Sequence, residues 1–398
     1  MTFILVYSIL LLLVFFAYTC MIAGFTFGLF KLSGSPVNRF NSSLSRHFNS
    51  RPTQDLPKKV SVIIPVRNEA ATIVKCLEGL WEQDYQEMEI IITDDFSEDY
   101  TLELVHRFAR QNSGFPLVIV DGKSSQPGET GKKRAIERAI VKASGAWIIT
   151  TDADTHRDAQ WISSMMKRSM EFNGQMLLGP VAFCNERTFL QKLQTLEFLG
   201  LMGVTAGSSQ LGYPVMCNGA NLAYRKEAFL SVGGFTGNTQ HFSGDDQFLL
   251  AAIRKRFGGG AIRFHWDKQA LVTTEPEKSW KGFVAQRIRW VSKSHGYREP
   301  AVVTVSLLTY MIHFLLLTGF VLGAFFLPLL IPSSALWLGK ILAEYPMVRI
   351  MARFMDKRQF LGYYFVAQVF QLFYIVIIGV SGQILPYRWK GRTSGRWQ

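Results

Sequence analysis

Acidic residues stand directly after two apolar, β-branched segments of this 398-residue chain. Asp94 and Asp95 follow the segment MEIIIT, and Asp152 and Asp154 follow WIITT. One aspartate at a strand end is usually a turn former, but two such sites on successive units of one sheet indicate more than turns. Asp-x-Asp on extended backbone offers two carboxylates to Mg²⁺ or Mn²⁺ and leaves positions for a diphosphate. We therefore expect Asp152 and Asp154 to bind a metal that neutralises a departing diphosphate.

A third acidic pair, Asp245 and Asp246, precedes a helix predicted at residues 247–257. Either side chain suits the N-cap of that helix. The alternative is that one carboxylate is a general base within reach of an acceptor hydroxyl. The pair alone does not decide between these two interpretations.

Two further segments suit a nucleotide. The turn after the first predicted strand carries Pro65, Asn68 and Glu69, whose backbone and polar side chains could hold a base or ribose. Gly131 and Lys132 open a helix after a loop rich in Gly, Pro and Ser, and a helix N-terminus with a lysine can bind phosphate. The spacing excludes a P-loop, which needs another glycine five residues earlier and Ser or Thr after the lysine.

The segment QRIRW supplies Gln286, Arg289 and Trp290 on a predicted helix shortly before the apolar C-terminal part of the chain. Its apolar residues favour an amphipathic helix at a membrane surface. In addition, tryptophan can stack on a sugar face while glutamine and arginine bind hydroxyls or phosphate.

The elements that must position these residues alternate along the middle of the chain. Strands are predicted at residues 60–65, 88–93, 117–120 and 147–151, and helices at 70–81, 100–110 and 131–143. Such alternation predicts an α/β fold with a mainly parallel sheet covered on both faces. In these sheets ligands bind at the carboxyl ends of the strands, where the acidic pairs fall.

Long apolar segments flank this middle part. Residues 2–30 are almost uncharged, long enough to cross a bilayer and followed by basic residues, which predicts a permanent anchor with a cytoplasmic domain after it. Residues 301–331 form one apolar run and residues 361–385 a clear span. Residues 335–354 carry four charges at spacings that suggest a tilted or interfacial helix. A flat helix here, which the positive-inside rule favours, returns the basic tail to the cytoplasm, whereas a crossing helix places the tail outside.

The resulting division has five parts. It comprises an N-terminal transmembrane anchor (1–30), a linker (31–57), a cytoplasmic catalytic domain (58–299), C-terminal transmembrane or interfacial helices (300–387) and a basic tail (388–398). We expect an integral protein of the plasma (inner) membrane. The net charge of +13 gathers beside the apolar segments, so we expect contact with lipid head groups and no nucleic-acid partner. Four widely separated cysteines fit a reduced compartment.

The order of these motifs resembles that of the family 2 inverting glycosyltransferases. The likeness covers residues 58–290 and is to the membrane-bound branch that includes hyaluronan, chitin and cellulose synthases and ceramide glucosyltransferases. The motifs that carry it occur in the order PVRNE, DD, GK, DAD, NGAN, GDD and QRIRW. The resemblance implies a GT-A fold, a nucleotide-sugar donor (usually a UDP-sugar) and a divalent metal, Mn²⁺ or Mg²⁺.

The resemblance also implies residue roles. Asp246 matches the catalytic base, and Asp152 and Asp154 match the metal and diphosphate ligands. The expected donor-binding residues are Pro65, Asn68, Glu69, Asp94, Asp95, Lys132 and Asp152, with Asp94 or Asp95 holding the base. The expected acceptor- or diphosphate-binding residues are Asn218, Gly219, Asp245, Gln286, Arg289 and Trp290. The family usually has glutamate where Asp245 stands, which puts the acceptor class in doubt.

Three functions are therefore open. The ending WKGR after the last span looks like that of lipid-modifying relatives and favours a lipid or lipid-linked acceptor. QRIRW is usual in processive polysaccharide synthases, although few spans are present to form a channel. A third possibility is a membrane-tethered sugar-nucleotide-binding protein without turnover.

Overall fold

The computed structural model describes residues 2–34, 59–122, 131–236, 244–293, 299–389 and 392–394. Most of the expected linker (31–57), the loop before Gly131, Ser243 and much of the basic tail (388–398) lie outside these ranges. Contacts divide the chain into two compact units. The helical unit comprises Met1–Lys31, Asn185–Leu211 and Pro276–Gln398, and the sheet unit comprises Leu32–Cys184 and Gly212–Glu275.

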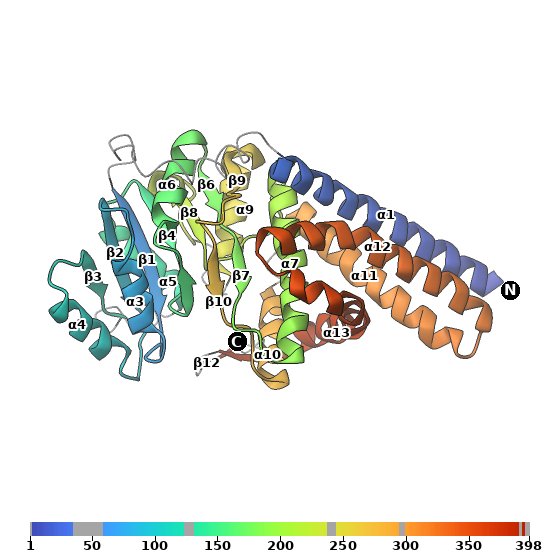
Figure 1. Ribbon diagram of the computed structural model, residues 1–398. Coiled ribbons are helices and arrows are strands. Elements are labelled where there is room, and N and C mark those ends of the chain that lie inside the picture. Colours follow the sequence, from blue (N-terminus) through green and yellow to red (C-terminus); the bar gives the residue numbers. More distant parts are fainter. Residues whose placement is uncertain are drawn as a thin grey trace. The chain divides into compact units, whose positions relative to one another are not determined.

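A mixed sheet forms the centre of the sheet unit (Figure 1). Its strand order is β3-β2-β1-β4-β8-β6-β9. The first four strands of this order are parallel, β8 is antiparallel to both of its neighbours, and β6 and β9 are parallel. The bounds are β1 Val60–Val66, β2 Met88–Asp94, β3 Leu117–Val120, β4 Trp147–Thr150, β6 Met176–Leu178, β8 Leu222–Arg225 and β9 Ile262–Phe264. The predicted α/β class with a mainly parallel sheet is confirmed.

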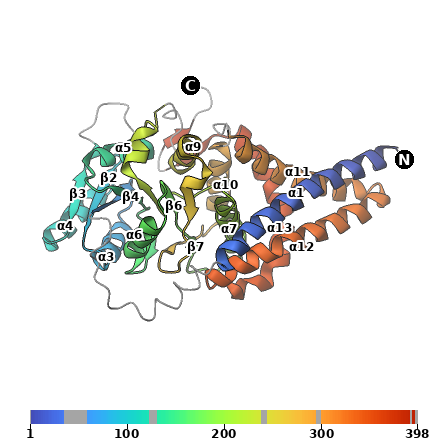
Figure 2. The same cartoon turned by 90° about the horizontal axis from the view of Figure 1, so that it is seen from above.

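Helices lie on both faces of this sheet, with α5 on one side and α3 and α6 on the other (Figure 2). The helices of the unit are α3 (Ile73–Trp81), α4 (Thr101–Gln111), α5 (Lys132–Lys142), α6 (Trp161–Glu171), α8 (Lys226–Ser231) and α9 (Asp245–Phe257). A second, three-stranded sheet has the order β5 (Thr155–Arg157), β10 (Val272–Thr274) and β7 (Val181–Phe183).

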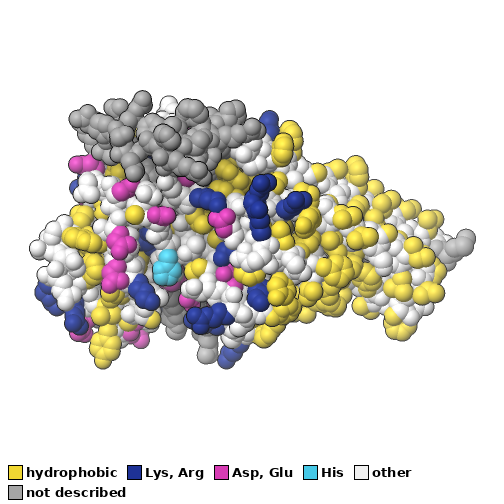
Figure 3. All heavy atoms as spheres, in the orientation of Figure 1, with side chains coloured by type: hydrophobic (Ala, Val, Ile, Leu, Met, Phe, Trp, Pro, Cys, Tyr) yellow, Lys and Arg dark blue, Asp and Glu magenta, His cyan; other side chains and the backbone are white. Residues whose placement is uncertain are grey.

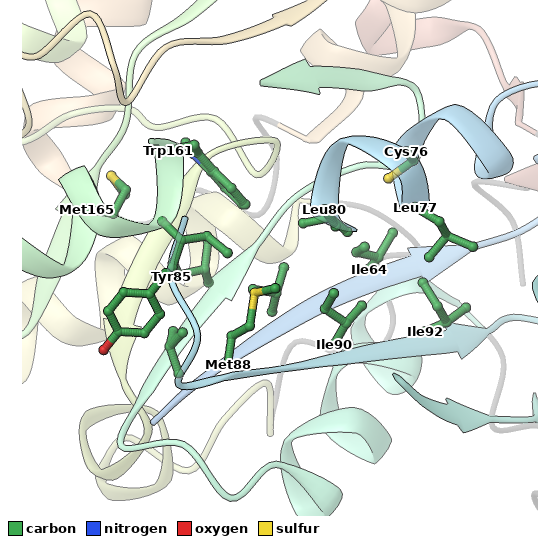
Figure 4. Packing of buried hydrophobic residues seen from close by; sticks show 14 of the residues in the cluster. Ile64, Cys76, Leu77, Leu80, Tyr85, Met88, Ile90, Ile92, Trp161 and Met165 are labelled. Carbon is green, nitrogen blue, oxygen red and sulfur yellow. The ribbon is translucent and has the colours of Figure 1, made fainter. Parts of the chain in front are cut away.

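The core between the sheet and α3 and α6 is apolar. Figure 4 shows Ile64, Ile90 and Ile92 of the central strands facing Leu77 and Leu80 of α3. All five are completely buried. Burying side chains of this size stabilises the fold by about 1.5–3 kcal/mol each. The ends of the strands that carry the acidic residues are therefore held on a rigid support.

The predicted elements of the sheet unit match the observed ones to within a few residues. The helix predicted at 70–81 begins later, at Ile73, because residues 69–72 form a turn closed by the carbonyl of Glu69. The helix predicted at 247–257 begins earlier, at Asp245. Its N-cap is Gly244, with a φ of 89° that suits glycine, so the N-capping interpretation of Asp245 and Asp246 is wrong.

The helical unit holds six long helices within the described ranges. They are α1 (Thr2–Gly34), α7 (Phe189–Gln210), α10 (Trp280–Ser292), α11 (Pro300–Gly323), α12 (Leu330–Phe354) and α13 (Tyr364–Ile384), followed by a hairpin of β11 (Tyr387–Trp389) and β12 (Arg392–Ser394). Four segments of the described chain are long and apolar enough to cross a membrane: Thr2–Gly34, Pro300–Gly323, Leu327–Phe354 and Arg358–Ile384. Hydrophobic side chains cover the visible surface over α1 and α12 (Figure 3).

The apolar run predicted at 301–331 spans the end of one helix and the start of the next. α11 ends at Gly323, and a short connection leads into α12 at Leu330. A hydrocarbon core of about 30 Å takes only ~20 helical residues, so a run of this length can contain a turn. The segment 335–354, which the charges made ambiguous, is the greater part of this continuous 25-residue helix.

Two of the four charges of α12, Lys340 and Glu344, point into the helical unit, whereas Arg349 and Arg353 are exposed. Lys340 and Glu344 form an ion pair of 2.8 Å, with side chains 1% and 10% exposed. Gln368 of α13 accepts a hydrogen bond from Lys340 and donates one to Glu344, and Tyr18 of α1 also donates to Glu344. α12 runs beside α1 in Figures 1 and 2. These charges therefore satisfy one another inside the bundle, where a water interface is not needed to solvate them.

Candidate active site

The loops after β1 and β2 are bound to each other at the carboxyl edge of the sheet. Asn68, at a φ of 52°, donates its backbone N–H to Ser97 Oγ over 3.0 Å. Its side-chain oxygen accepts from the backbone of Glu98 over 2.8 Å. The N–H of Glu69 donates to Thr101 Oγ1, also over 2.8 Å. The polar residues of PVRNE thus fix the shape of this edge, and their contact with a base or ribose stays a prediction.

Asp94 and Asp95 are both buried, at 0% and 2% exposure. The carboxylate of Asp94 accepts the N–H of Ser97 and so closes its own turn. The carboxylate of Asp95 accepts the N–H of Gly131 over 2.7 Å. Gly131 has a φ of 111° and immediately precedes α5, so Asp95 fixes the position from which Lys132 extends.

Lys132 joins two of the acidic motifs. Its ammonium donates to Asp152 Oδ1 over 2.7 Å and lies 3.8 Å from Asp245 Oδ2, although the side chain is only 18% exposed. Burial lowers the pKa of Lys132, but the carboxylates of Asp152, Asp245 and Asp246 outweigh burial and raise the pKa above its usual value. Lys132 is therefore a permanent cation between the end of β4 and the start of α9.

Gly219 lies among the same charged groups. Its N–H donates to Asp246 Oδ2 over 3.1 Å. A Cβ added at this glycine would lie 3.5 Å from each of Lys132 Nζ, Asp245 Oδ2 and Asp246 Cβ. The structure thus brings together five predicted site residues from four separate segments: Lys132, Asp152, Gly219, Asp245 and Asp246.

Asn218 and Asn221 hold the NGAN turn in place. Asn218 Oδ1 accepts the N–H of Ala220, and Asn221 is completely buried. Asn221 donates to the carbonyls of Pro180 and Ala270, each over 2.8 Å, and its oxygen accepts from the indole of Trp161. Asn221 was not among the predicted site residues, although the NGAN motif contains it. It fixes the turn that presents Gly219.

Tyr224 is a second residue that the sequence did not single out. It is 1% exposed on β8, and its hydroxyl has no hydrogen-bond partner among the described residues. Burial raises the pKa of Tyr224, and the charge of Asp245 raises it further. Within an apolar strand its sequence signal is that of an ordinary core residue.

The donors at the end of β4 fit a cation that is only partly coordinated by protein. Asp152 is held by Lys132, and Asp154 is exposed two residues further along. The described residues contain no group of three or more His, Cys, Asp or Glu suited to hold a metal. Magnesium-type ions commonly take one or two carboxylates and fill the other positions with substrate phosphates and water. Asp152 and Asp154 fit that pattern.

The QRIRW motif lies in the helical unit, on α10. Gln286 Nε2 donates to Glu277 Oε1 over 3.2 Å, and Gln286, Arg289 and Trp290 are all partly buried. The predicted helix is observed, and its apolar residues Phe283 and Ile288 are buried. The predicted site residues are thus divided between the two compact units.

Comparisons with known proteins relate this chain to glycosyltransferases. Residues 61–233 match the family described as Glycosyl transferase family 2. The poly-beta-1,6-N-acetyl-D-glucosamine synthase of Staphylococcus aureus (strain COL) is 25% identical over 269 residues, which cover 66% of this chain and 61% of that protein. The synthase of the same name from a Staphylococcus epidermidis strain is 25% identical over 264 residues, covering 64% and 60%. The chain therefore matches about three fifths of the length of these relatives.

One solved structure has the same overall fold. It is a mannosyltransferase from Pyrobaculum calidifontis in complex with GDP-Man and Mn²⁺, with a TM-score of 0.54 and 17% sequence identity, covering 91% of this chain and 99% of that one. The predicted GT-A fold is confirmed. Over residues 61–233 the chain is therefore similar to family 2 glycosyltransferases.

Proposed function

We propose that the protein is a membrane-bound inverting glycosyltransferase. It would move a sugar from a nucleotide-diphospho-sugar, expected to be a UDP-sugar, to a lipid or lipid-linked acceptor at the cytoplasmic face of the plasma (inner) membrane. The observation that carries this proposal is the convergence of Lys132, Asp152, Gly219, Asp245 and Asp246 within one domain. Four apolar helices in the same chain support a membrane location.

The proposed reaction is a single displacement. The carboxylate of Asp246 accepts the proton of the acceptor hydroxyl, and the acceptor oxygen forms a bond to the anomeric carbon of the donor sugar. The bond from that carbon to the diphosphate breaks, and the nucleotide diphosphate leaves with the electron pair. Attack opposite the leaving group inverts the anomeric carbon. Asp246 suits this role because the N–H of Gly219 holds one carboxylate oxygen in a fixed direction.

Lys132 would act on the charge of the diphosphate. It is held on a rigid helix start by Asp95 and Gly131 and keeps its proton at neutral pH. A fixed cation stabilises charge that grows as the leaving group departs, because it needs no reorganisation during the reaction. A divalent cation bound by Asp152 and Asp154 would supply further Lewis-acid stabilisation of the same oxygens.

A processive polysaccharide synthase is the second candidate. The staphylococcal relatives carry that kind of name, poly-beta-1,6-N-acetyl-D-glucosamine synthase, and match two thirds of this chain. The acceptor would then be the end of a growing glycan in place of a lipid. The WKGR ending after the last span supports the lipid acceptor.

Product size separates these candidates. The full-length protein in nanodiscs would be incubated with Mn²⁺, membrane lipid extract and each of a panel of radiolabelled nucleotide sugars, and the products separated by lipid extraction and gel electrophoresis. One sugar on an extractable lipid is the expected result. A polymer ladder would indicate that the acceptor is a growing glycan and not a lipid. Donor binding without transfer or hydrolysis for every donor would contradict the enzymatic proposal and favour a non-catalytic binding protein.

A further inference from the structure

Arg287 is the most enclosed charge of the QRIRW segment. Its side chain is 3% exposed, and it forms a two-pronged ion pair with Glu197 of α7. The Nε–H donates to Glu197 Oε1 over 3.0 Å, and an Nη2–H donates to Oε2 over 2.5 Å. The resemblance assigned no role to this position, which lies between the motif residues Gln286 and Trp290.

The same guanidinium contacts both of those motif residues. Its Nη1 donates to the side-chain oxygen of Gln286. Its central carbon lies 4.2 Å from the ring centre of Trp290 and 4.6 Å from that of Phe283. Gln286 therefore has its carbonyl fixed by Arg287, and its amide fixed by Glu277 over 3.2 Å.

The ion pair also ties α10 to two other helices of the helical unit. Glu197 belongs to α7, and its Oε1 also accepts the hydroxyl of Tyr374 of α13. The ring of Tyr374 packs edge-on to Phe283, with 5.5 Å between the ring centres. One network thus joins α7, α10 and α13.

These contacts leave Arg287 little capacity to bind a substrate. Nε–H, Nη1–H and Nη2–H all have protein partners, and aromatic rings lie against the planar group. Burial lowers the pKa of Arg287, but Glu197 outweighs this effect, so the pKa is raised and the charge persists. Removing one partner of such a pair leaves an uncompensated buried charge.

We propose that Arg287 is a positioning residue for transfer: with Glu197 and Tyr374 it fixes the side chains of Gln286 and Trp290 on α10. This inference rests on the proposed function, in which those two motif residues act at the sugar or diphosphate. Misplacement of a substrate-positioning group by about 1 Å can cost about 100-fold in rate. The network should therefore affect kcat more than donor affinity.

The test compares four variants of the full-length protein in nanodiscs. Arg287→Lys keeps the charge but loses the planar fork, Glu197→Gln keeps the shape but loses the charge, and Tyr374→Phe removes only a hydroxyl. Lys281→Gln, at an exposed cation on the same helix, is the matched control. Transfer rate, donor dissociation constant, melting temperature and hydrogen exchange across α10 would be measured for each.

We expect Arg287→Lys and Glu197→Gln to lower kcat by about 10- to 100-fold with less than about a 3-fold change in donor affinity. Tyr374→Phe should lower kcat by about 3- to 10-fold, as for loss of one hydrogen bond. Amide exchange across Trp280–Ser292 should be faster than in wild type and in Lys281→Gln, with exchange in α9 unchanged.

Three results would overturn the inference. They are unchanged kcat in Arg287→Lys and Glu197→Gln, an equal loss of donor affinity and rate, or unchanged exchange in α10. The exchange measurement separates this failure from that of the proposed function. If wild-type protein transferred no sugar, faster exchange in α10 would still support the positioning network, and unchanged exchange would refute it.

Discussion

Lys132 carries the positive charge that compensates Asp152 and Asp245. Its ammonium is within 2.7 Å and 3.8 Å of those carboxylates. Lys132→Gln should therefore leave two acidic groups facing the donor diphosphate without a cation. A hydrogen bond to a charged group is worth about 1.5–3 kcal/mol, so we expect donor affinity to fall by about 10- to 100-fold. Isothermal titration with the donor would measure the change.

The control for this prediction lies on the same helix. Lys142, at the other end of α5, is exposed, and Lys142→Gln removes the same charge from the protein. Its donor affinity should stay within about 2-fold of wild type. Equal weakening by both substitutions would mean that net charge, and not the position of Lys132, governs binding.

His265 makes the sheet unit sensitive to acid. It is 4% exposed, and its Nε2 lies 2.8 Å from Ser164 Oγ, which donates to Asp267. Burial lowers the pKa of His265 to about 4, against the opposite effect of Asp267. The folded protein therefore binds this proton less readily than the unfolded chain, whose histidine pKa is about 6.5. The contribution of His265 to the free energy of unfolding is therefore fully present above pH 6.5 and decreases as the pH falls towards 4.

The expected loss is about 3 kcal/mol between pH 6.5 and 4, of which about 2 kcal/mol is lost by pH 5. Melting temperatures of wild type and His265→Gln would be compared from pH 7 to pH 5. The melting temperature of His265→Gln should be lower than that of wild type at pH 7, but it should decrease less between pH 7 and pH 5. Parallel curves for the two proteins would rule out His265 as the group responsible.

At the residue level, short motifs singled out Asp152, Asp246 and Lys132, and the fold gathers these residues around Gly219. Their roles in binding and catalysis stay predictions. Arg287 and Tyr224 could not be found this way. Arg287 interacts with Glu197, and Tyr224 is influenced by the charge of Asp245. These partners are distant in sequence, and only the fold brings them close.

Among the elements, α12 gives the sharpest stability prediction. Lys340→Met would leave the carboxylate of Glu344 buried without its cation. We expect this single change to destabilise the protein by about 3–5 kcal/mol. Adding Glu344→Gln removes the orphaned charge and keeps an acceptor for Tyr18, so the double variant should be more stable than Lys340→Met.

Thermal unfolding of both variants in detergent would measure this difference. Lys281→Gln, which removes an exposed cation outside the predicted spans, should melt like wild type. A double variant less stable than Lys340→Met would show that the pair does not form, and the inward orientation of α12 would have to be abandoned.

Element prediction was accurate for β1, β2, β3 and β4, but it did not identify the strands from β5 to β10 or the end of the first C-terminal helix. The β-branched runs at β1, β2 and β3 have one explanation, burial in a sheet, and their bounds followed from the sequence. In the run 301–331 hydrophobicity is uniform on every side, so no periodicity marks the end of α11 at Gly323. The charges of α12 are compatible with water or with buried partners, and sequence alone cannot choose.

At the scale of the whole molecule, the compact units do not follow the order of the chain. α7 and its flanking residues come from the middle of the sequence but contact α1, α12 and α13 in the helical unit. A Cβ at Gly207 would lie 2.1 Å from the carbonyl oxygen of Phe25, so α1 and α7 pack backbone to backbone. Hydropathy does not reveal such an insertion, because α7 is only moderately apolar. The boundaries expected at residues 58 and 299 separate a cytoplasmic catalytic domain from the membrane segments, and they stay predictions.

The central claim is that Asp246 removes a proton from an acceptor hydroxyl in a site built for a nucleotide sugar. The decisive measurement is transfer of radiolabelled sugar by the full-length protein in nanodiscs, for wild type, Asp246→Asn and the exposed control Glu103→Gln. The transfer rate should fall by at least about 1,000-fold in Asp246→Asn, while its donor affinity stays within about 3-fold of wild type. The transfer rate of Glu103→Gln should equal that of wild type. Wild-type turnover in Asp246→Asn would contradict the account.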